Sequence, residues 1–194
     1  MDYHYNCSVD YGYTFKKRLP DGKYYGYSPK DSNLILVEAK YLNRKKSGEW
    51  RTYNPYEKTQ EFCQYENGQQ VTKKHLDSLG RITFIVKYVK RQEFGHYYDF
   101  HNERQLKVHE EFWRHKRKST QIITKYYPNG QVESIIRYKN NRGNTKPIGK
   151  WTEYYEDGKP KSFEEFGKNW KRIGVWRKWN ADGEIVSEND YGTK

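Results

Sequence analysis

The side chains in this sequence that could do chemistry include six histidines and two pairs of neighbouring glutamates. The histidines stand at positions 4, 75, 96, 101, 109 and 115, and none of them forms the HxH or HExxH spacing of a metal site. His109 and His115 lie in a basic segment and are predicted to be surface residues. Glu110–Glu111 and Glu164–Glu165 are adjacent pairs, and neighbours on a strand point to opposite faces. Paired acid–base catalysis is therefore not expected at these glutamates.

The sequence contains no motif that would supply a nucleophile, a cofactor or a metal. It has no GxSxG, P-loop or dinucleotide fingerprint. Cys7 and Cys63 are too few for a disulfide framework or a zinc site, and Cys63 has no evident histidine partner in sequence. We expect two buried free thiols, with a single bridge as the alternative if the protein is exported. The sequence thus predicts no enzyme, no cofactor and no metal.

The strongest candidates for binding are aromatic side chains beside positive charge. Two segments combine them, FWRHKRK at 112–118 and GKNWKRIG at 167–174. Tryptophan and arginine dominate binding hot spots, so these residues are the predicted partner-binding set. Its members are Trp113, Arg114, Lys116, Arg117, Lys168, Trp170, Lys171 and Arg172. The competing interpretation of Trp170 is that it folds back onto the neighbouring repeat. Rings with cations also suit single-stranded nucleic acid, although no RNP, KH or zinc-finger motif occurs.

The charge of the chain points to an acidic partner. The formal net charge is +12 and the pI is near 9.4, which favours nucleic acid, anionic lipid or an acidic protein. The competing interpretation is a lysine-rich solvated surface that protects sheet edges. No run of about 18 apolar residues occurs, and the start MDYHYNCSVDYGY lacks the features of a signal peptide. We expect a cytoplasmic protein, while a leader removed before residue 1 stays open.

The apolar residues favour β-structure. Ten Ile, nine Val and 34 aromatic residues stand against two Ala, seven Leu and one Met. β-branched and aromatic side chains fit a pleated, half-buried surface. A deep aliphatic core is not expected, so the core must depend on aromatic rings.

Three segments repeat around an Asn-Gly or Asp-Gly turn. They read KYYPNGQVES (125–134), EYYEDGKPKS (153–162) and KWNADGEIVS (178–187). The turn glycines are Gly130, Gly158 and Gly183, and Asp21-Gly22 and Asn67-Gly68 are two earlier candidates. Asn-Gly and Asp-Gly between aromatic or β-branched runs are the strongest short-range signal of a β-hairpin.

A second element, Gly-x-Trp followed by an aromatic residue, precedes two of these turns. We expect the glycine to let the indole lie against the backbone of the preceding strand. Looser copies follow Gly95, with Tyr97 and Phe100, and include Ile123 with Tyr126. Rings stacked from one hairpin to the next would form a structural layer. The predicted structural residues of the repeat are Gly48, Trp50, Tyr53, Gly130, Gly149, Trp151, Tyr154, Gly158, Gly174, Trp176, Trp179 and Gly183.

These patterns predict an all-β fold, an elongated array (meander) of antiparallel β-hairpin repeats in one continuous domain. Residues 1–68 would form N-terminal hairpins with degenerate repeats, and 119–194 the regular repeats. Residues 69–118 are less regular, and an irregular or helical insert could interrupt or cover the array there. Within them, RITFIVKYV (81–89) is predicted to be a buried central strand. The segment 106–118 fits either a strand or a short amphipathic helix.

On these residues the chain resembles the MORN-variant repeat proteins, in particular the YwqK family of bacterial antitoxin components. Gly149, Trp151, Tyr154, Tyr155, Asp157 and Gly158 match the family pattern, and the resemblance covers about the last 75 residues. It implies a β scaffold, and an antitoxin or immunity protein that neutralises a toxin by docking. Residues 69–118 depart from the pattern.

Two functional hypotheses follow, with a third kept beside them. The first is a non-enzymatic protein-binding module of the antitoxin or immunity type, whose partner is acidic near the docking site. The alternative is a platform that binds nucleic acid or an anionic membrane through its basic surface. The third is architectural, in which sheet edges join copies of the chain.

Overall fold

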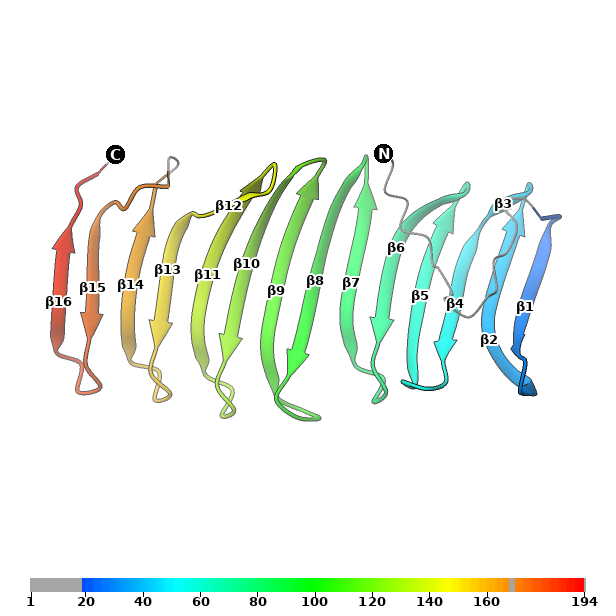
Figure 1. The fold of residues 1–194 in the computed structure, drawn as a ribbon, viewed down its shortest axis with the longest axis horizontal. Coiled ribbons are helices and arrows are strands. Elements are labelled where there is room, and N and C mark those ends of the chain that lie inside the picture. Colours follow the sequence, from blue (N-terminus) through cyan, green and yellow to red (C-terminus); the bar gives the residue numbers. More distant parts are fainter. Residues whose placement is uncertain (1–18, 168–169, 194) are drawn as a thin grey trace. The chain divides into compact units, whose positions relative to one another are not determined.

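The computed structural model describes residues 19–167 and 170–193, and in them it contains sixteen β-strands and no helix (Figure 1). The chain divides into two compact units, Met1–Val89 and Lys90–Lys194. The predicted partner residue Lys168 lies outside the described residues, as does Cys7.

The first unit is an antiparallel sheet in which the strands pair in chain order. β3 pairs with β2 beside β4, so that β3 and β4 together face β2. The strands are β1 (Gly22–Ser28), β2 (Asp31–Leu42), β3 (Lys45–Lys46), β4 (Gly48–Asn54), β5 (Thr59–Glu66), β6 (Gln69–Leu76) and β7 (Ile82–Val89).

The second unit repeats this plan. β12 pairs with β11 beside β13, as β3 pairs with β2 beside β4. Its strands are β8 (Gln92–Phe100), β9 (Leu106–His115), β10 (Lys118–Tyr126), β11 (Val132–Asn141), β12 (Asn144–Pro147), β13 (Gly149–Tyr154), β14 (Pro160–Phe166), β15 (Val175–Trp179) and β16 (Ile185–Asp190). The predicted all-β hairpin array is therefore confirmed in both units.

The middle of the sequence is regular, and the expected irregular or helical insert is wrong. Residues 69–118 contain β6, β7, β8 and β9, and β9 keeps an unbroken antiparallel register with β10 from Val108 to His115. Alternation is weak in β9 because most of its side chains are only half-buried, so both faces accept polar residues. β7 is a strand as predicted, but it is not buried throughout: Val86 is 1% exposed and Ile82 40%.

The repeat turns are closed by a glycine in the left-handed region. Tyr127 and Tyr155 are the first residues of two of these turns. Each donates its backbone N–H to the carbonyl of the residue four positions later, Gln131 and Lys159, at 2.8 Å. Gly130 and Gly158 have φ of 88° and 85°. The asparagine or aspartate before each glycine keeps a negative φ, so these are three-residue loops with a glycine bulge. Asn67-Gly68, with φ of 51° and 83°, is a two-residue turn.

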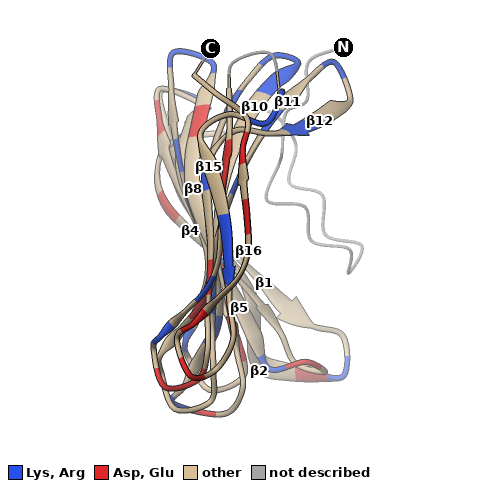
Figure 2. Cartoon of the chain, turned by 90° about the vertical axis from the view of Figure 1, so that its left-hand side faces the viewer, with Lys and Arg blue, Asp and Glu red and all other residues tan. Residues whose placement is uncertain are grey.

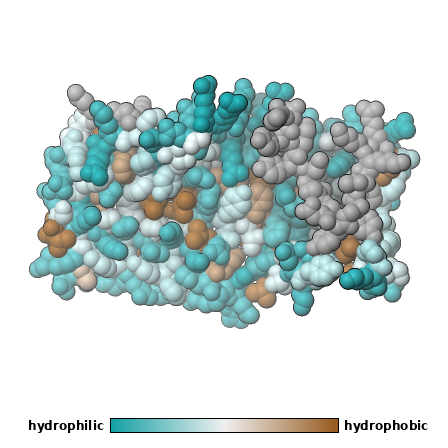
Figure 3. Space-filling view, in the orientation of Figure 1, coloured by the Kyte–Doolittle hydropathy of each residue, from teal (hydrophilic) through white to brown (hydrophobic). Residues whose placement is uncertain are grey.

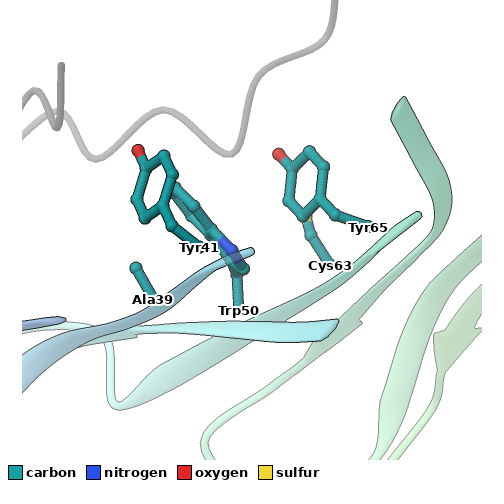
Figure 4. Close-up of a cluster of buried hydrophobic side chains, with 5 residues drawn as sticks. All are labelled: Ala39, Tyr41, Trp50, Cys63 and Tyr65. Atoms are coloured by element: carbon teal, nitrogen blue, oxygen red, sulfur yellow. The ribbon is translucent and has the colours of Figure 1, made fainter. Parts of the chain in front are cut away.

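Aromatic rings form the predicted layer in both units. In the first unit Tyr41, Trp50 and Tyr65 stack with centroids 5.4 and 5.1 Å apart, and Ala39 and Cys63 complete the buried cluster (Figure 4). In the second unit five rings follow one another at 5.1 Å: Tyr138, Trp151, Phe166 and Trp176 from β11, β13, β14 and β15, and Tyr191 directly after β16. Within the described residues these rings supply much of the buried layer, and Leu36, Val37 and Val86 add buried aliphatic side chains in the first unit.

The Gly-x-Trp element is a bulge that directs two donors to one carbonyl. Trp151 donates its indole Nε1–H to the carbonyl of Arg137 (2.9 Å), which also accepts the backbone N–H of Ile148 (3.1 Å). The same arrangement joins Ser47 and Trp50 to Lys40, and Ile173 and Trp176 to Glu165. The indole thus lies against the preceding strand, as predicted.

The reason for the glycine differs from the one expected. A Cβ on Gly48, Gly149 or Gly174 would meet side-chain atoms only, and none closer than 3.3 Å. All three glycines have φ between 60° and 67°, a left-handed conformation that most residues avoid. Backbone conformation, and not close approach of the preceding strand's backbone, therefore requires glycine here.

Cys63 is disulfide-bonded, so the expectation of a free thiol at this position is wrong. Its side chain is fully buried on β5, in the aromatic cluster of the first unit (Figure 4). Gln70 on β6 donates its side-chain N–H to the sulfur at 3.3 Å.

Candidate functional site

Alternate turns of the second unit meet at one edge of its sheet, which we call the basic turn edge. It consists of residues 90–91, 116–118, 142–146 and 170–172. The register places them together: Gln92 lies opposite His115, and Lys118 opposite Asn141. Alternate turns of a meander return to the same edge, so residues far apart in sequence become neighbours there.

The basic turn edge carries nine Lys and Arg residues and no Asp or Glu. All of these cations except Lys146 are exposed. The opposite turn edge of the same unit, residues 101–105, 127–131, 155–159 and 180–184, carries five acidic and two basic residues. Figure 2 shows the Lys and Arg gathered at the turns beside β11 and β12. The positive charge of the second unit is thus concentrated on one edge of its sheet.

A groove lies on this edge between the β9–β10 turn and the β11–β12 turn. Its volume is about 490 Å³. Arg142 donates its backbone N–H to the carbonyl of Arg117 (2.8 Å), which ties the two turns together. The lining residues are Arg114, Lys116, Arg117, Lys118, Ser119, Asn140, Arg142 and Gly143.

The first predicted cluster is divided between the two faces of the sheet. Arg114, Lys116 and Arg117 line the groove. Trp113, as a neighbour of Arg114 on β9, points to the other face, where its indole N–H donates to the side-chain oxygen of Gln92 (3.3 Å). Arg114 lies over the ring of Phe112, 4.2 Å from its centroid. The structure therefore joins the cations of this cluster but separates them from Trp113.

The second predicted cluster, on the loop after β14, is also divided. Trp170 is 41% exposed and has a φ of 65°, and Lys146 of β12 lies 5.9 Å from its ring centroid. Arg172 lies over Trp176 at 4.5 Å and donates to the hydroxyl of Tyr191 (3.0 Å). Arg172 thus extends the aromatic layer, whereas Trp170 offers an accessible ring. Lys171 is exposed.

The sequence analysis missed the groove residues outside the basic run. Arg142, Asn140 and Gly143 belong to the segment NNRGN, and Lys118 was not among the predicted site residues. Asn140 shapes the turn, because its side chain accepts the N–H of Gly143 (3.0 Å) and donates to Thr145 (2.7 Å). The sequence could have revealed these residues, because alternate turns of a meander lie at the same edge of the sheet. The 142–143 turn is therefore expected beside the 116–117 turn.

A second polar group, the histidine stack, lies on the opposite face of β8 and β9. His96 Nδ1 and His109 Nε2 are 3.0 Å apart, and Tyr98 stacks on His109 at 4.9 Å. Partial burial lowers the pKa of His109; positive charge on His96 acts the same way, while Glu111 opposes it. In residues 19–167 and 170–193 no group of three or more His, Cys, Asp or Glu is arranged to hold a metal ion.

Two segments of the chain match a known family. The MORN repeat variant matches residues 122–140 and 147–166. These segments contain the 127–131 and 155–159 turns with their flanking strands. These two segments are similar to the MORN repeat variant. No curated protein matches the chain.

MORN repeats are generally associated with protein or membrane binding and are not typically catalytic. The glycine bulge and the tryptophan contact recur outside the matched segments, with Gly48 at the start of β4 and Gly174 directly before β15. In the part of the chain that the structure describes, no helix is long and apolar enough to cross a membrane.

Proposed function

We propose that this chain is a non-enzymatic docking module that recognises an acidic partner protein through the basic turn edge. The observation that supports this is the set of nine cations without a carboxylate on residues 90–91, 116–118, 142–146 and 170–172. Complementary charge steers association and disfavours partners of the same sign. The rigid sheet behind the turns holds these charges in place.

The partner is proposed to be a toxin or effector that the chain neutralises, as an antitoxin or immunity protein does. Support for this finer role comes from the resemblance to the YwqK family. A nuclease with a basic active-site cleft would be repelled by this edge, so the expected docking surface is acidic.

Matched charge reversals test the role of the edge. Arg117→Glu with Arg142→Glu changes the basic turn edge, and Arg104→Glu with Lys125→Glu changes the opposite end of the same strands. Each substitution lowers the net charge by two, so both double variants carry +8 in place of +12. With a purified candidate toxin, we expect at least a tenfold loss of affinity for the first pair only. Equal loss in both pairs would mean that net charge alone drives binding.

The role in toxin neutralisation needs its own measurement. We expect co-expression of the chain to restore growth of cells that produce the toxin, and the Arg117→Glu, Arg142→Glu variant to restore it less. Full rescue of growth by that variant would show that the basic turn edge is not part of the docking surface.

The alternative function, a platform for nucleic acid or an anionic membrane, is favoured by the same edge. Neutralising several phosphates makes the affinity fall steeply with salt concentration. Titrations of single-stranded DNA and of phosphatidylserine vesicles at 50 and 200 mM salt distinguish the two functions. Tight one-to-one association with the candidate toxin, without DNA or vesicle binding at either salt concentration, supports docking. DNA or vesicle binding that is lost steeply as the salt concentration rises supports the alternative.

The disulfide at Cys63 bears on where docking takes place. Disulfides persist in oxidising compartments and are rare in the cytosol. A cytoplasmic location therefore stays a prediction, and we propose an oxidising compartment as its rival. Because Cys63 is buried, the test is alkylation under denaturing conditions, directly after acid quenching of the cells. Labelling of Cys63 only after a reductant is added supports the oxidising compartment, and labelling without a reductant supports the cytoplasm.

A further inference from the structure

The groove on the basic turn edge has features of a binding site for a small anion, and it forms part of the proposed docking surface. Its two walls are turns, 116–118 and 142–143, and the hydrogen bond from Arg142 N–H to Arg117 holds them together. The volume of about 490 Å³ falls within the range of small-ligand sites. The groove is open to solvent, so its cations can be reached by a ligand.

The charge in the groove exceeds what a single carboxylate can balance. Five of the eight lining residues are Lys or Arg, and none is Asp or Glu. Among the described residues near them, Glu93 pairs with Arg114 at 3.8 Å, which compensates one positive charge. About four charges stay uncompensated. A ligand with three or four negative charges close together would match them.

The types of donor favour phosphate over other anions. Arginine offers a planar fork that binds two phosphate oxygens at once, and lysine adds a compact charge. Three arginines and two lysines surround the groove, together with the hydroxyl-bearing residue Ser119. The side chain of Asn140 is hydrogen-bonded within its own turn and helps to shape one wall of the groove. The Lys and Arg side chains of the groove are then the groups that would bind the ligand.

We propose that this groove binds a ligand that carries two or more linked phosphate groups. The linked phosphates of a di- or triphosphate supply the required charge within the length of the groove. The groove shares Arg117 and Arg142 with the proposed docking surface, so a polyphosphate and an acidic partner protein would compete for these cations. Binding of the phosphate ligand does not require the partner protein.

Calorimetric titration of the full chain with sodium tripolyphosphate at constant ionic strength tests the proposal. The variant is Arg117→Ala with Arg142→Ala, and the matched control is Arg104→Ala with Lys125→Ala. Arg142 has a φ of 55°, and alanine keeps the Cβ, so the backbone strain at that position is unchanged. We expect at least a tenfold weaker affinity in the variant and less than a twofold change in the control.

Further titrations define the ligand. Citrate carries a similar charge on carboxylates, and we expect it to bind at least tenfold more weakly than tripolyphosphate. ATP that binds as tightly as tripolyphosphate supports the proposal with a nucleotide as the source. Equal affinity for citrate, an equal loss in the control variant, or no binding of tripolyphosphate overturns it. Binding of phosphatidylserine vesicles without tripolyphosphate binding also overturns it, in favour of a membrane contact. Circular dichroism of both variants confirms that they are folded.

Discussion

Individual side chains carry the contact from one repeat to the next. The first residue of three successive turns reaches a backbone carbonyl about 25 residues further on. His101 contacts the carbonyl of Tyr126 at 2.7 Å, and Tyr127 and Tyr155 donate their hydroxyls to Tyr154 and Trp179 at 2.8 Å. Because a carbonyl only accepts, His101 must donate from Nε2. His101 therefore fills the place of tyrosine in a repeat that the sequence does not show as one.

Tyr127→Phe isolates one of these contacts. The change removes the hydroxyl and keeps the ring, so we expect the free energy of unfolding to fall by about 1 kcal/mol. Urea denaturation measures it. The matched control is Tyr126→Phe, which should stay within about 0.5 kcal/mol of the parent. An equal effect of the two substitutions would contradict a specific role for the Tyr127 hydroxyl.

His109 predicts a dependence of stability on pH. Its pKa is lowered in the folded chain, mainly by burial, so the unfolded chain binds the proton first as the pH falls. Its neighbours are His96 and Tyr98 on β8, Lys107 and Glu111 on β9, and uncharged Thr124 on β10. Stability from this group is complete above the ordinary histidine pKa of about 6.5 and is lost as the pH falls through the lower folded value.

The measurement is the change in melting temperature between pH 7.5 and pH 5. We expect His109→Gln to show a smaller decrease than the parent. His115→Gln is a suitable control, since it removes a histidine from the end of the same strand. A decrease in His109→Gln as large as that of the parent would exclude His109 as the source.

At the scale of the hairpin, turn chemistry is the most predictable feature of the molecule. Four of the five Asn-Gly and Asp-Gly pairs mark hairpin turns, because few residues accept a left-handed conformation. Asp21-Gly22 does not mark one among the described residues, because Gly22 is the first residue of β1 and no described strand precedes it. The turns at Asn43-Arg44 and Lys90-Arg91 could not be found in this way, since none of these residues is glycine although all four have positive φ. There the pairing of the flanking strands overrides local preference.

Gly130→Ala tests the left-handed turn. Gly130 has a φ of 88°, and a Cβ would meet nothing within 4 Å, so strain is the only cost. We expect a loss of about 1 kcal/mol in the free energy of unfolding. Gly130→Asn serves as the comparison, because asparagine tolerates this conformation and should lose less. Urea denaturation in which alanine and asparagine behave alike would contradict the explanation.

The candidate site shows where sequence reasoning stops. The basic runs around 112–118 and 167–174 were visible, but a run does not reveal which side chains share a face. Strand alternation separates Trp113 from Arg114, and the next turn supplies Arg142. The groove therefore depends on the register between β10 and β11, which no single segment specifies.

For the whole molecule, the sheet itself is the only scaffold among the described residues. All described strands pair within sheets, and no helix covers a face. On the face seen in Figure 3, hydrophobic residues form small separate groups between hydrophilic and intermediate ones. Stability must then come from contacts between neighbouring hairpins, as in other repeat proteins.

Hydrogen exchange should follow this arrangement within the second unit. β16 pairs only with β15, whereas β9 and β10 each have partners on both sides. We expect the amides of β16 to exchange at least tenfold faster than the paired amides of β9 and β10, because edge hairpins open locally at lower cost. Uniform protection from β9 to β16 would show that the unit opens only as a whole.

The forward reach of the turn side chains limits how such a chain can change during evolution. Tyr127 and Tyr155 each depend on an acceptor in the following hairpin, so loss of half a hairpin would leave a donor facing no carbonyl. After duplication or deletion of a complete hairpin, each turn hydroxyl again faces a backbone carbonyl in the hairpin that follows it. We therefore expect descendants of this chain to differ in length by steps of about 25 residues, with shorter insertions confined to the outermost strand.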